Sequence, residues 1–200
     1  MTTWINPSET GRDRGVRGLL KTYVSILISP KRFFDSAVVP GDQVPGLIFG
    51  VVIALGYTVG VVFVTASAPS TVAQPEAFAS VILLMAVGLI IGPITLHLAA
   101  AFQTVLLIGL APDRGGVSET VQLIAYASAP CLFAFIQVPI IRLITCAYAW
   151  SLLLVGTRSV HSTSRLRAIA AGGPTGALLY GGLFRGFDAF EMLLTTNGIM

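Results

Sequence analysis

Two long stretches without a charged side chain constrain this chain more than any other feature of its sequence. Residues 43–75 form an uncharged run of 33 residues, and residues 77–112 form one of 36. About 20 apolar residues in a helix are enough to cross the ~30 Å hydrocarbon core of a bilayer. Each run therefore predicts one transmembrane helix with uncharged flanks, the first over residues 44–65 and the second over residues 78–110.

The composition excludes an ordinary soluble domain. Hydrophobic residues make up 54% of the 200 residues and charged residues only 10%, and the mean hydropathy is +0.85. A soluble domain has about a quarter of its residues charged, which covers its surface. We therefore predict an all-α, polytopic integral membrane bundle. We expect this bundle to interact with the lipid bilayer, and other membrane proteins are candidate partners. We do not expect it to bind nucleic acid, because the basic residues cluster at the ends of apolar runs.

Three shorter apolar segments predict three further crossings. We expect helices over residues 119–138, 140–157 and 168–185. Pro139 marks the reversal between the first two of these helices, and arginines flank the third. The predicted transmembrane domain thus covers residues 41–186 and holds about five helices.

The second long run admits another arrangement. Gly92-Pro93 would divide residues 77–112 into two short membrane-embedded halves, which gives six crossings or a re-entrant pair. This arrangement would distribute the basic residues more evenly between the two sides of the membrane than five crossings do. We therefore favour a single helix, with a kink at Pro93.

The lysines and arginines predict how the bundle is oriented. With five crossings, ten of the 12 lie on the side of the N-terminus, and only Arg142 and Arg185 lie on the other. Basic residues are retained on the cytoplasmic side. We therefore expect a cytoplasmic N-terminal segment over residues 1–40 and a short C-terminal tail outside, over residues 187–200. For a prokaryotic chain, the expected location is the cell membrane.

The N-terminal segment contains a candidate surface-bound helix. Residues 18–37 combine apolar side chains with lysines and arginines, and they are too short and too charged to span the bilayer. We predict an amphipathic helix at the level of the headgroups, with Phe33 and Phe34 dipping into the acyl boundary. A cytoplasmic helix that packs on the loops of the bundle is the alternative.

Apart from Glu119 and Arg185 at the very ends of two predicted spans, these spans contain no charged side chain except Arg142, which lies near an interface. Ion-coupled transporters and intramembrane proteases need ionisable groups at depth. Cys131 and Cys146 lack the spacing of a metal site. We therefore expect no enzyme, no catalytic residue, no cofactor and no metal. An enzyme acting on lipids would have to use His97, Tyr126 or His161, which form no recognisable constellation.

A few polar and proline residues at depth are the candidates for function. The polar and kink positions are His97, Gln103, Gln122, Tyr126, Pro93 and Pro130. As a ligand or proton carrier, His97 would need the two glutamines or the tyrosine as partners. An interhelical hydrogen bond, or a place at the interface, is the alternative for His97.

Small residues recur at four-residue spacing, which places them on one face of a helix. The candidate packing positions are Gly46, Gly50, Gly56, Gly60, Gly88, Gly92, Gly173 and Gly181, with Ala177 between the last two. Such faces let helix backbones approach closely in lipid. They favour packing within the bundle over self-association of the protein.

Several short elements are shared with a known family. They are Ser29-Pro30-Lys31-Arg32-Phe33-Phe34, Gly115-Gly116, Thr120, Tyr126 with Pro130, Trp150, Gly156, His161, Ser164 and Ala168. In these residues the chain resembles the prokaryotic branch of the Yip1-domain membrane proteins. The resemblance implies five transmembrane helices and a cytoplasmic N-terminus.

The resemblance also sets an expectation for function. Eukaryotic members are implied in vesicle trafficking and in binding Rab-type GTPases, but this chain lacks their long cytosolic region and its Asp-Leu-Tyr-Gly-Pro-like element. GTPase binding is therefore not carried over. We expect a non-enzymatic protein that organises membrane or binds other membrane proteins. The alternative is a permease-like or channel-forming subunit for a small solute, with the helix breaks at Gly92-Pro93 and Ala129-Pro130 lining a cavity.

Overall fold

The fold is a helical membrane bundle. The computed structural model describes residues 15–67, 77–112 and 114–198, and every regular element among them is a helix. Three of these helices, Val44–Val64, Phe78–Leu110 and Pro139–Val160, are long and apolar enough to cross a bilayer. The predicted all-α membrane fold is confirmed.

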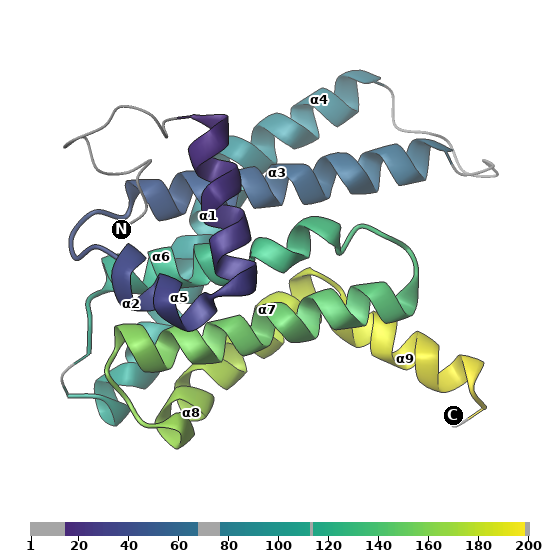
Figure 1. Ribbon diagram of the computed structural model, residues 1–200. Coiled ribbons are helices and arrows are strands. Elements are labelled where there is room, and N and C mark those ends of the chain that lie inside the picture. The colour runs from purple at the N-terminus through teal and green to yellow at the C-terminus, as the bar shows by residue number, and fades with distance from the viewer. Residues whose placement is uncertain (1–14, 68–76, 113, 199–200) are drawn as a thin grey trace.

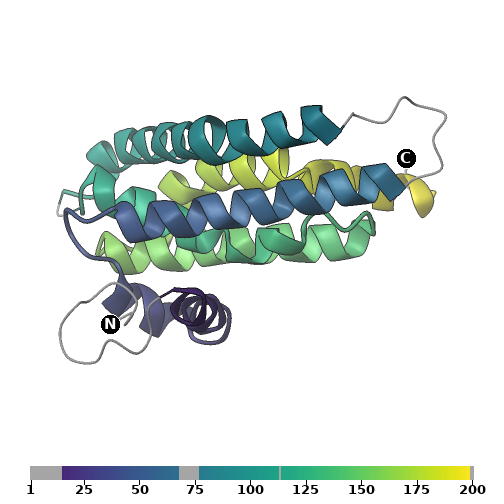
Figure 2. The ribbon, with the colours of Figure 1, turned by 90° about the horizontal axis from the view of Figure 1, so that it is seen from above.

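The chain runs back and forth along one axis (Figure 1). In chain order the elements are α1 (Val16–Ile28), α2 (Pro30–Ala37), α3 (Val44–Ser67), α4 (Ala77–Ala86), the π-helix η1 (Val87–Ile91), α5 (Gly92–Leu110), α6 (Val117–Ala127), the 3₁₀-helix η2 (Ala129–Phe133), α7 (Pro139–Val160), α8 (Arg165–Gly176), the π-helix η3 (Ala177–Leu183) and α9 (Gly186–Thr196). The passes α3, α4–η1–α5, α6–η2, α7 and α8–η3 alternate in direction. Helix α1 lies across the side of the bundle (Figure 2).

The long run after α3 forms one continuous helix. Residues Phe78–Leu110 stay helical, and η1 inserts a π-turn directly before Gly92 and Pro93. The proline ring clashes with the carbonyl one turn before it and removes a hydrogen bond, and the wider π-turn accommodates both effects. The structure therefore has no division into two halves here.

The segment expected as a helix over residues 119–138 is broken, so that prediction is wrong. Helix α6 ends at Ala127, η2 makes a 3₁₀ turn, and the chain up to Val138 is not helical. Pro130 lacks the N–H that would continue the helix. At the end of α6 the carbonyl of Ile124 accepts both the Ser128 N–H, at 3.1 Å, and the Ser128 hydroxyl, at 2.9 Å.

The C-terminal part also differs from the prediction. The last pass begins at Arg165, where the Ser164 side chain accepts a hydrogen bond from the Arg167 N–H at 3.4 Å, and it ends in η3. Arg185 then adopts a left-handed conformation, with φ 61°, and the chain bends into α9 (Figure 1). The predicted tail over residues 187–200 contains the helix α9, which lies along α7.

The N-terminal segment forms two helices where we predicted one over residues 18–37. Pro30 starts α2 because proline is favoured in the first turn of a helix. Phe33 and Phe34 are 5% and 2% exposed and lie in the protein core, which corrects the expectation that they dip into lipid. The ring of Phe33 packs edge-on against Tyr126, at 5.0 Å between ring centroids.

Glycines bring α3 close to the third pass. A methyl group added at Gly46 would lie 2.7 Å from the Gln122 Cα, and one added at Gly50 would lie 2.9 Å from the Ala125 Cβ. Further along α3, Gly56 contacts Leu132 and Gly60 contacts Phe135. The remaining candidates differ: Gly88 is in ordinary contact with Leu55, Gly92 faces the Val87 carbonyl, Gly181 contacts Phe187, and Gly173 has open space.

Replacing Gly46 by alanine is expected to destabilise the bundle by about 1–3 kcal/mol, because the new methyl group meets backbone that cannot move aside. Gly173→Ala is the matched control. Its methyl group meets nothing within 4 Å, so it should be neutral or gain up to about 1 kcal/mol of helix propensity. Thermal unfolding in one detergent compares the two variants, and equal melting temperatures would contradict this account of the packing.

Candidate functional site

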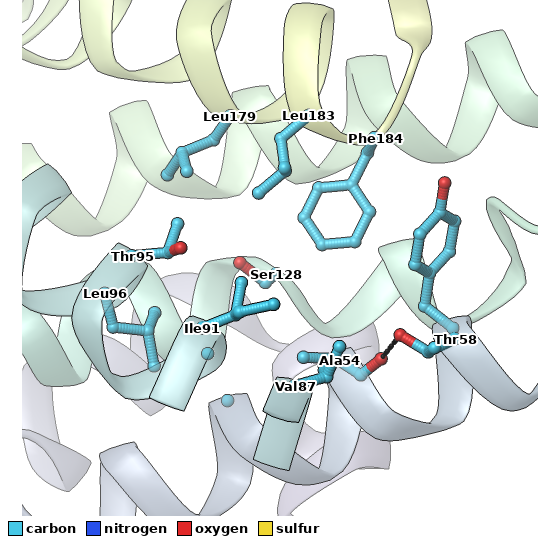
Figure 3. A pocket seen from close by; sticks show the side chains of 13 residues that line it. Ala54, Thr58, Val87, Ile91, Thr95, Leu96, Ser128, Leu179, Leu183 and Phe184 are labelled. Atoms are coloured by element: carbon cyan, nitrogen blue, oxygen red, sulfur yellow. Dashed lines mark hydrogen bonds between the residues drawn. The ribbon is translucent and has the colours of Figure 1, made fainter. Parts of the chain in front are cut away.

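An apolar cavity lies inside the bundle, between α3, η1, the start of α5 and η3 (Figure 3). Its volume is about 130 Å³. The hydroxyls at its wall serve their own helices: Thr58 donates to the Ala54 carbonyl at 2.8 Å, and Ser128 to the Ile124 carbonyl. The cavity is therefore lined almost entirely by hydrocarbon.

The irregular parts of three passes meet around this cavity. Val87 and Ile91 come from the π-helix η1, Ser128 from the end of α6, and Leu179 and Leu183 from the π-helix η3. The candidate kink residues Pro93 and Pro130 do not line the cavity. Pro93 follows η1, which lines the cavity, and Pro130 lies in η2, two residues after the lining residue Ser128.

A buried polar seam ties three passes together away from the cavity. The Gln103 amide donates to the Thr157 hydroxyl at 2.8 Å, which links α5 to α7. Thr120 on α6 is 3.3 Å from the Thr104 hydroxyl and 3.4 Å from His161 Nε2. Interhelical hydrogen bonds of this kind stabilise membrane bundles.

Gln122 attaches the loop before α3 to the centre of the bundle. Its side-chain oxygen accepts from the Val39 N–H at 3.1 Å, and its side-chain nitrogen donates to the Val39 carbonyl at 2.7 Å. One amide thus satisfies both polar groups of a backbone residue 83 positions away. The N-terminal helices are held to α6 by this contact.

Tyr126 is a core residue. It is fully buried, and its ring packs edge-on against Phe33 and against Phe49, at 5.0 and 5.3 Å between centroids. Its hydroxyl has no hydrogen-bond partner among the described residues. Tyr126 therefore joins α2, α3 and α6 through aromatic packing.

His97 lies apart from the three residues proposed as its partners. Its Nδ1 atom is 2.7 Å from the Pro93 carbonyl, one turn earlier in the same helix. Gln103, Gln122 and Tyr126 have the other neighbours described above. The contact with Pro93 uses a carbonyl next to the helix irregularity at η1.

The charged side chains are dispersed. The described residues include no group of three or more His, Cys, Asp or Glu side chains that could hold a metal ion. Cys131 and Cys146 are buried free thiols. Chemically, the arrangement offers an apolar chamber and a set of helix-to-helix hydrogen bonds.

Sequence reasoning missed the residues that complete the polar seam. Thr157 and Thr104 were not among the predicted site residues. Val39, whose backbone bonds to Gln122 in a separate contact, lies outside every predicted span. Thr120 entered only through the family resemblance, and His161 through the resemblance and the enzyme alternative. Serine and threonine hydroxyls often bond to the carbonyl four residues earlier in their own helix. The sequence therefore does not indicate which of these hydroxyls also bond to a neighbouring helix.

The polar seam should weaken in acid. His161 lies just beyond the end of α7 and is 1% exposed. Burial lowers the pKa of His161 from 6.5 to about 4, although Glu119 acts to raise the pKa. Below pH 6.5 His161 binds a proton in the unfolded chain but stays neutral in the folded chain until about pH 4. The free energy of unfolding is therefore highest above pH 6.5 and should fall by roughly 3 kcal/mol by pH 4. Melting temperatures between pH 7.5 and 4.5 measure this loss.

His161→Asn is the control for this pH dependence, because asparagine keeps polar atoms near Thr120 but does not titrate in this range. The variant should lose less stability than the wild type on acidification. An equal loss in both proteins would assign the acid sensitivity to other groups.

Comparison with known proteins gives one match. A family model described as the Yip1 domain matches residues 24–185. This range begins in α1 and ends directly after η3, so it includes the cavity and the polar seam. The searches of curated proteins and of solved structures each found no match.

Proposed function

Because the chain belongs to the Yip1 domain family, we propose that this membrane protein is non-enzymatic and organises the bilayer or binds other membrane proteins. In this proposal the N-terminal helices form the surface that contacts lipid or another membrane protein. The basic end of the bundle faces the cytoplasm. The observation that carries the proposal is an apolar stripe on α1.

The stripe consists of Val16, Leu20, Val24 and Ile28. Their four-residue spacing places them along one side of α1, and each is between 49% and 76% exposed. A different face of the helix, with Ile26, is buried against the bundle. Helix α1 therefore has one side for the protein and another apolar side that the described residues do not cover.

Basic residues adjoin the stripe, as expected for a helix at the membrane surface. Arg17 and Lys21 are exposed on α1, and such residues interact with anionic headgroups while the apolar side enters the acyl boundary. Helix α1 lies across the bundle axis (Figures 1 and 2), as a helix parallel to the bilayer would. These features support an interfacial position.

Helix α1 is fixed to the spanning helices. The Tyr148 hydroxyl of α7 donates to the Leu27 carbonyl at 2.5 Å, and Ile26 is fully buried. A helix held in this way adds volume to one leaflet at a fixed place beside the bundle. Such a wedge can bend the bilayer, and its apolar stripe can also receive a helix of another membrane protein.

A permease-like or channel-forming role is the second candidate. The cavity supports it, because η1, just before Pro93, and Ser128, two residues before Pro130, both line that cavity. The lining provides little for a hydrated solute to bond to, which counts against this role. Solute flux into proteoliposomes separates it from the leading proposal.

Leu20→Asp with Val24→Asp should abolish the organising activity. Both side chains are exposed, so the bundle should still fold while α1 loses its affinity for the acyl boundary. The wild type should narrow reconstituted vesicles, as seen by electron microscopy, or retain a membrane partner in mild detergent, and the variant should do neither. Leu20→Ile with Val24→Ile is the matched control. If the aspartate variant equals the control in both assays, the proposal fails.

The proposed orientation predicts which engineered cysteines can be labelled from which side. Ser36→Cys on α2 and Ser162→Cys after α7 should react from the cytoplasmic side, and Thr196→Cys on α9 from outside. All three positions are exposed, and a membrane-impermeant maleimide reports their side. Labelling of Ser36→Cys and Thr196→Cys from the same side would contradict this topology.

A further inference from the structure

Two arginines depart from the charge distribution of the bundle. Arg142 lies in the first turn of α7, and Arg185 lies between η3 and α9. The other basic residues that the structure describes lie after α5, in the last turn of α7, in the N-terminal helices or at the start of α8. Two cations at the opposite end of the bundle call for a specific explanation.

Both arginines border one end of the apolar cavity. Phe184, directly before Arg185, lines the cavity and packs on the ring of Tyr57, at 5.0 Å between centroids. Cys146, one turn after Arg142 on α7, has its Sγ atom 3.7 Å from the Phe184 carbonyl. Both guanidinium groups lie within electrostatic range of the Tyr57 side chain, which marks the same end of the cavity.

The two guanidinium groups are held in place with donors to spare. Nε of Arg142 donates to the Ala134 carbonyl at 2.9 Å, next to the helix break. Nε of Arg185 donates to the Asp188 carboxylate at 2.7 Å. Each guanidinium has five N–H donors in a planar fork, which suits bidentate binding of a phosphate. With Asp188 as the carboxylate paired to Arg185, a positive charge remains across the pair.

The cavity has an opening toward the lipid-facing surface. Ile91 and Leu183 both line it and are 45% and 52% exposed, and Figure 3 places them on its two sides, at η1 and η3. An apolar cavity does not hold ordered water but takes up apolar groups. A hydrocarbon chain from the surrounding lipid is the chemical match for this interior.

We propose that Arg142 and Arg185 bind the phosphate of an anionic phospholipid while one of its acyl chains enters the cavity. The positive charge of the arginines favours an anionic headgroup, and the apolar lining of the cavity favours an acyl chain. The site lies at the end of the bundle opposite to the basic end formed by α2 and the α7–α8 turn, so it is independent of the surface on α1.

The test measures how full-length protein in nanodiscs retains phosphatidylglycerol relative to phosphatidylcholine, by native mass spectrometry. Arg142→Gln with Arg185→Gln should weaken the preference for phosphatidylglycerol at least tenfold. Arg165→Gln with Arg167→Gln removes the same charge elsewhere and should leave the preference unchanged. Equal retention in both double variants, or no preference in the wild type, would overturn the proposal.

Two further variants keep the test decisive if Arg142→Gln prevents folding. Arg185→Gln alone changes a side chain that is 62% exposed, and it should weaken the preference severalfold. Ala54→Leu adds hydrocarbon at the cavity wall and should reduce retention of long-chain phosphatidylglycerol while leaving binding of inorganic phosphate unchanged. If Ala54→Leu, folded by its melting temperature, retains the long-chain lipid fully, the acyl chain does not enter the cavity.

Discussion

The close approach of α3 to the α6–η2 pass is the contact on which the rest of the structure depends. Lipid gives two helices no hydrophobic reason to associate, so their backbones must come near enough for van der Waals packing. Glycines at Gly46 and Gly50 allow that distance. The close approach of these two passes places the Gln122 amide beside the Val39 backbone and packs the Tyr126 ring against Phe49. The attachment of the N-terminal helices follows from this one approach.

The departures from regular helix are concentrated around one cavity for a physical reason. Backbone polar groups inside a bilayer must be satisfied by the protein, so a break is tolerated only where neighbours supply hydrogen bonds. Ser128 supplies its hydroxyl to Ile124, and Arg142 supplies its Nε to Ala134. Such local solutions leave side chains less evenly packed than regular helices do, and the space that results is the chamber beside Ile91 and Leu183.

The sequence predicted the long membrane spans, because the thickness of a bilayer determines how many apolar residues a span needs. Uncharged runs indicated the spans beginning at Val44 and Phe78, and the all-α membrane fold and the family were both confirmed. Pro130 was expected to kink its helix, but the end of regular helix at Ala127 was not predicted, because length and hydropathy alone favoured continuing that helix to residue 138. The partners of Gln122 and Gln103 depend on which helices become neighbours, 83 and 54 positions away. No local spacing encodes that choice.

The second pass has a consequence for the membrane in which the protein resides. Its 33 helical residues extend about 50 Å at 1.5 Å per residue, well beyond the ~30 Å of a typical hydrocarbon core. Apolar side chains such as Phe78 and Met85 in its first turns are exposed. This excess length must be absorbed by leaning the helix or by thickening the lipid around it. The mismatch on this one helix is therefore smaller in a thick bilayer than in a thin one, whereas the spans of 21 and 22 residues at Val44–Val64 and Pro139–Val160 match an ordinary core.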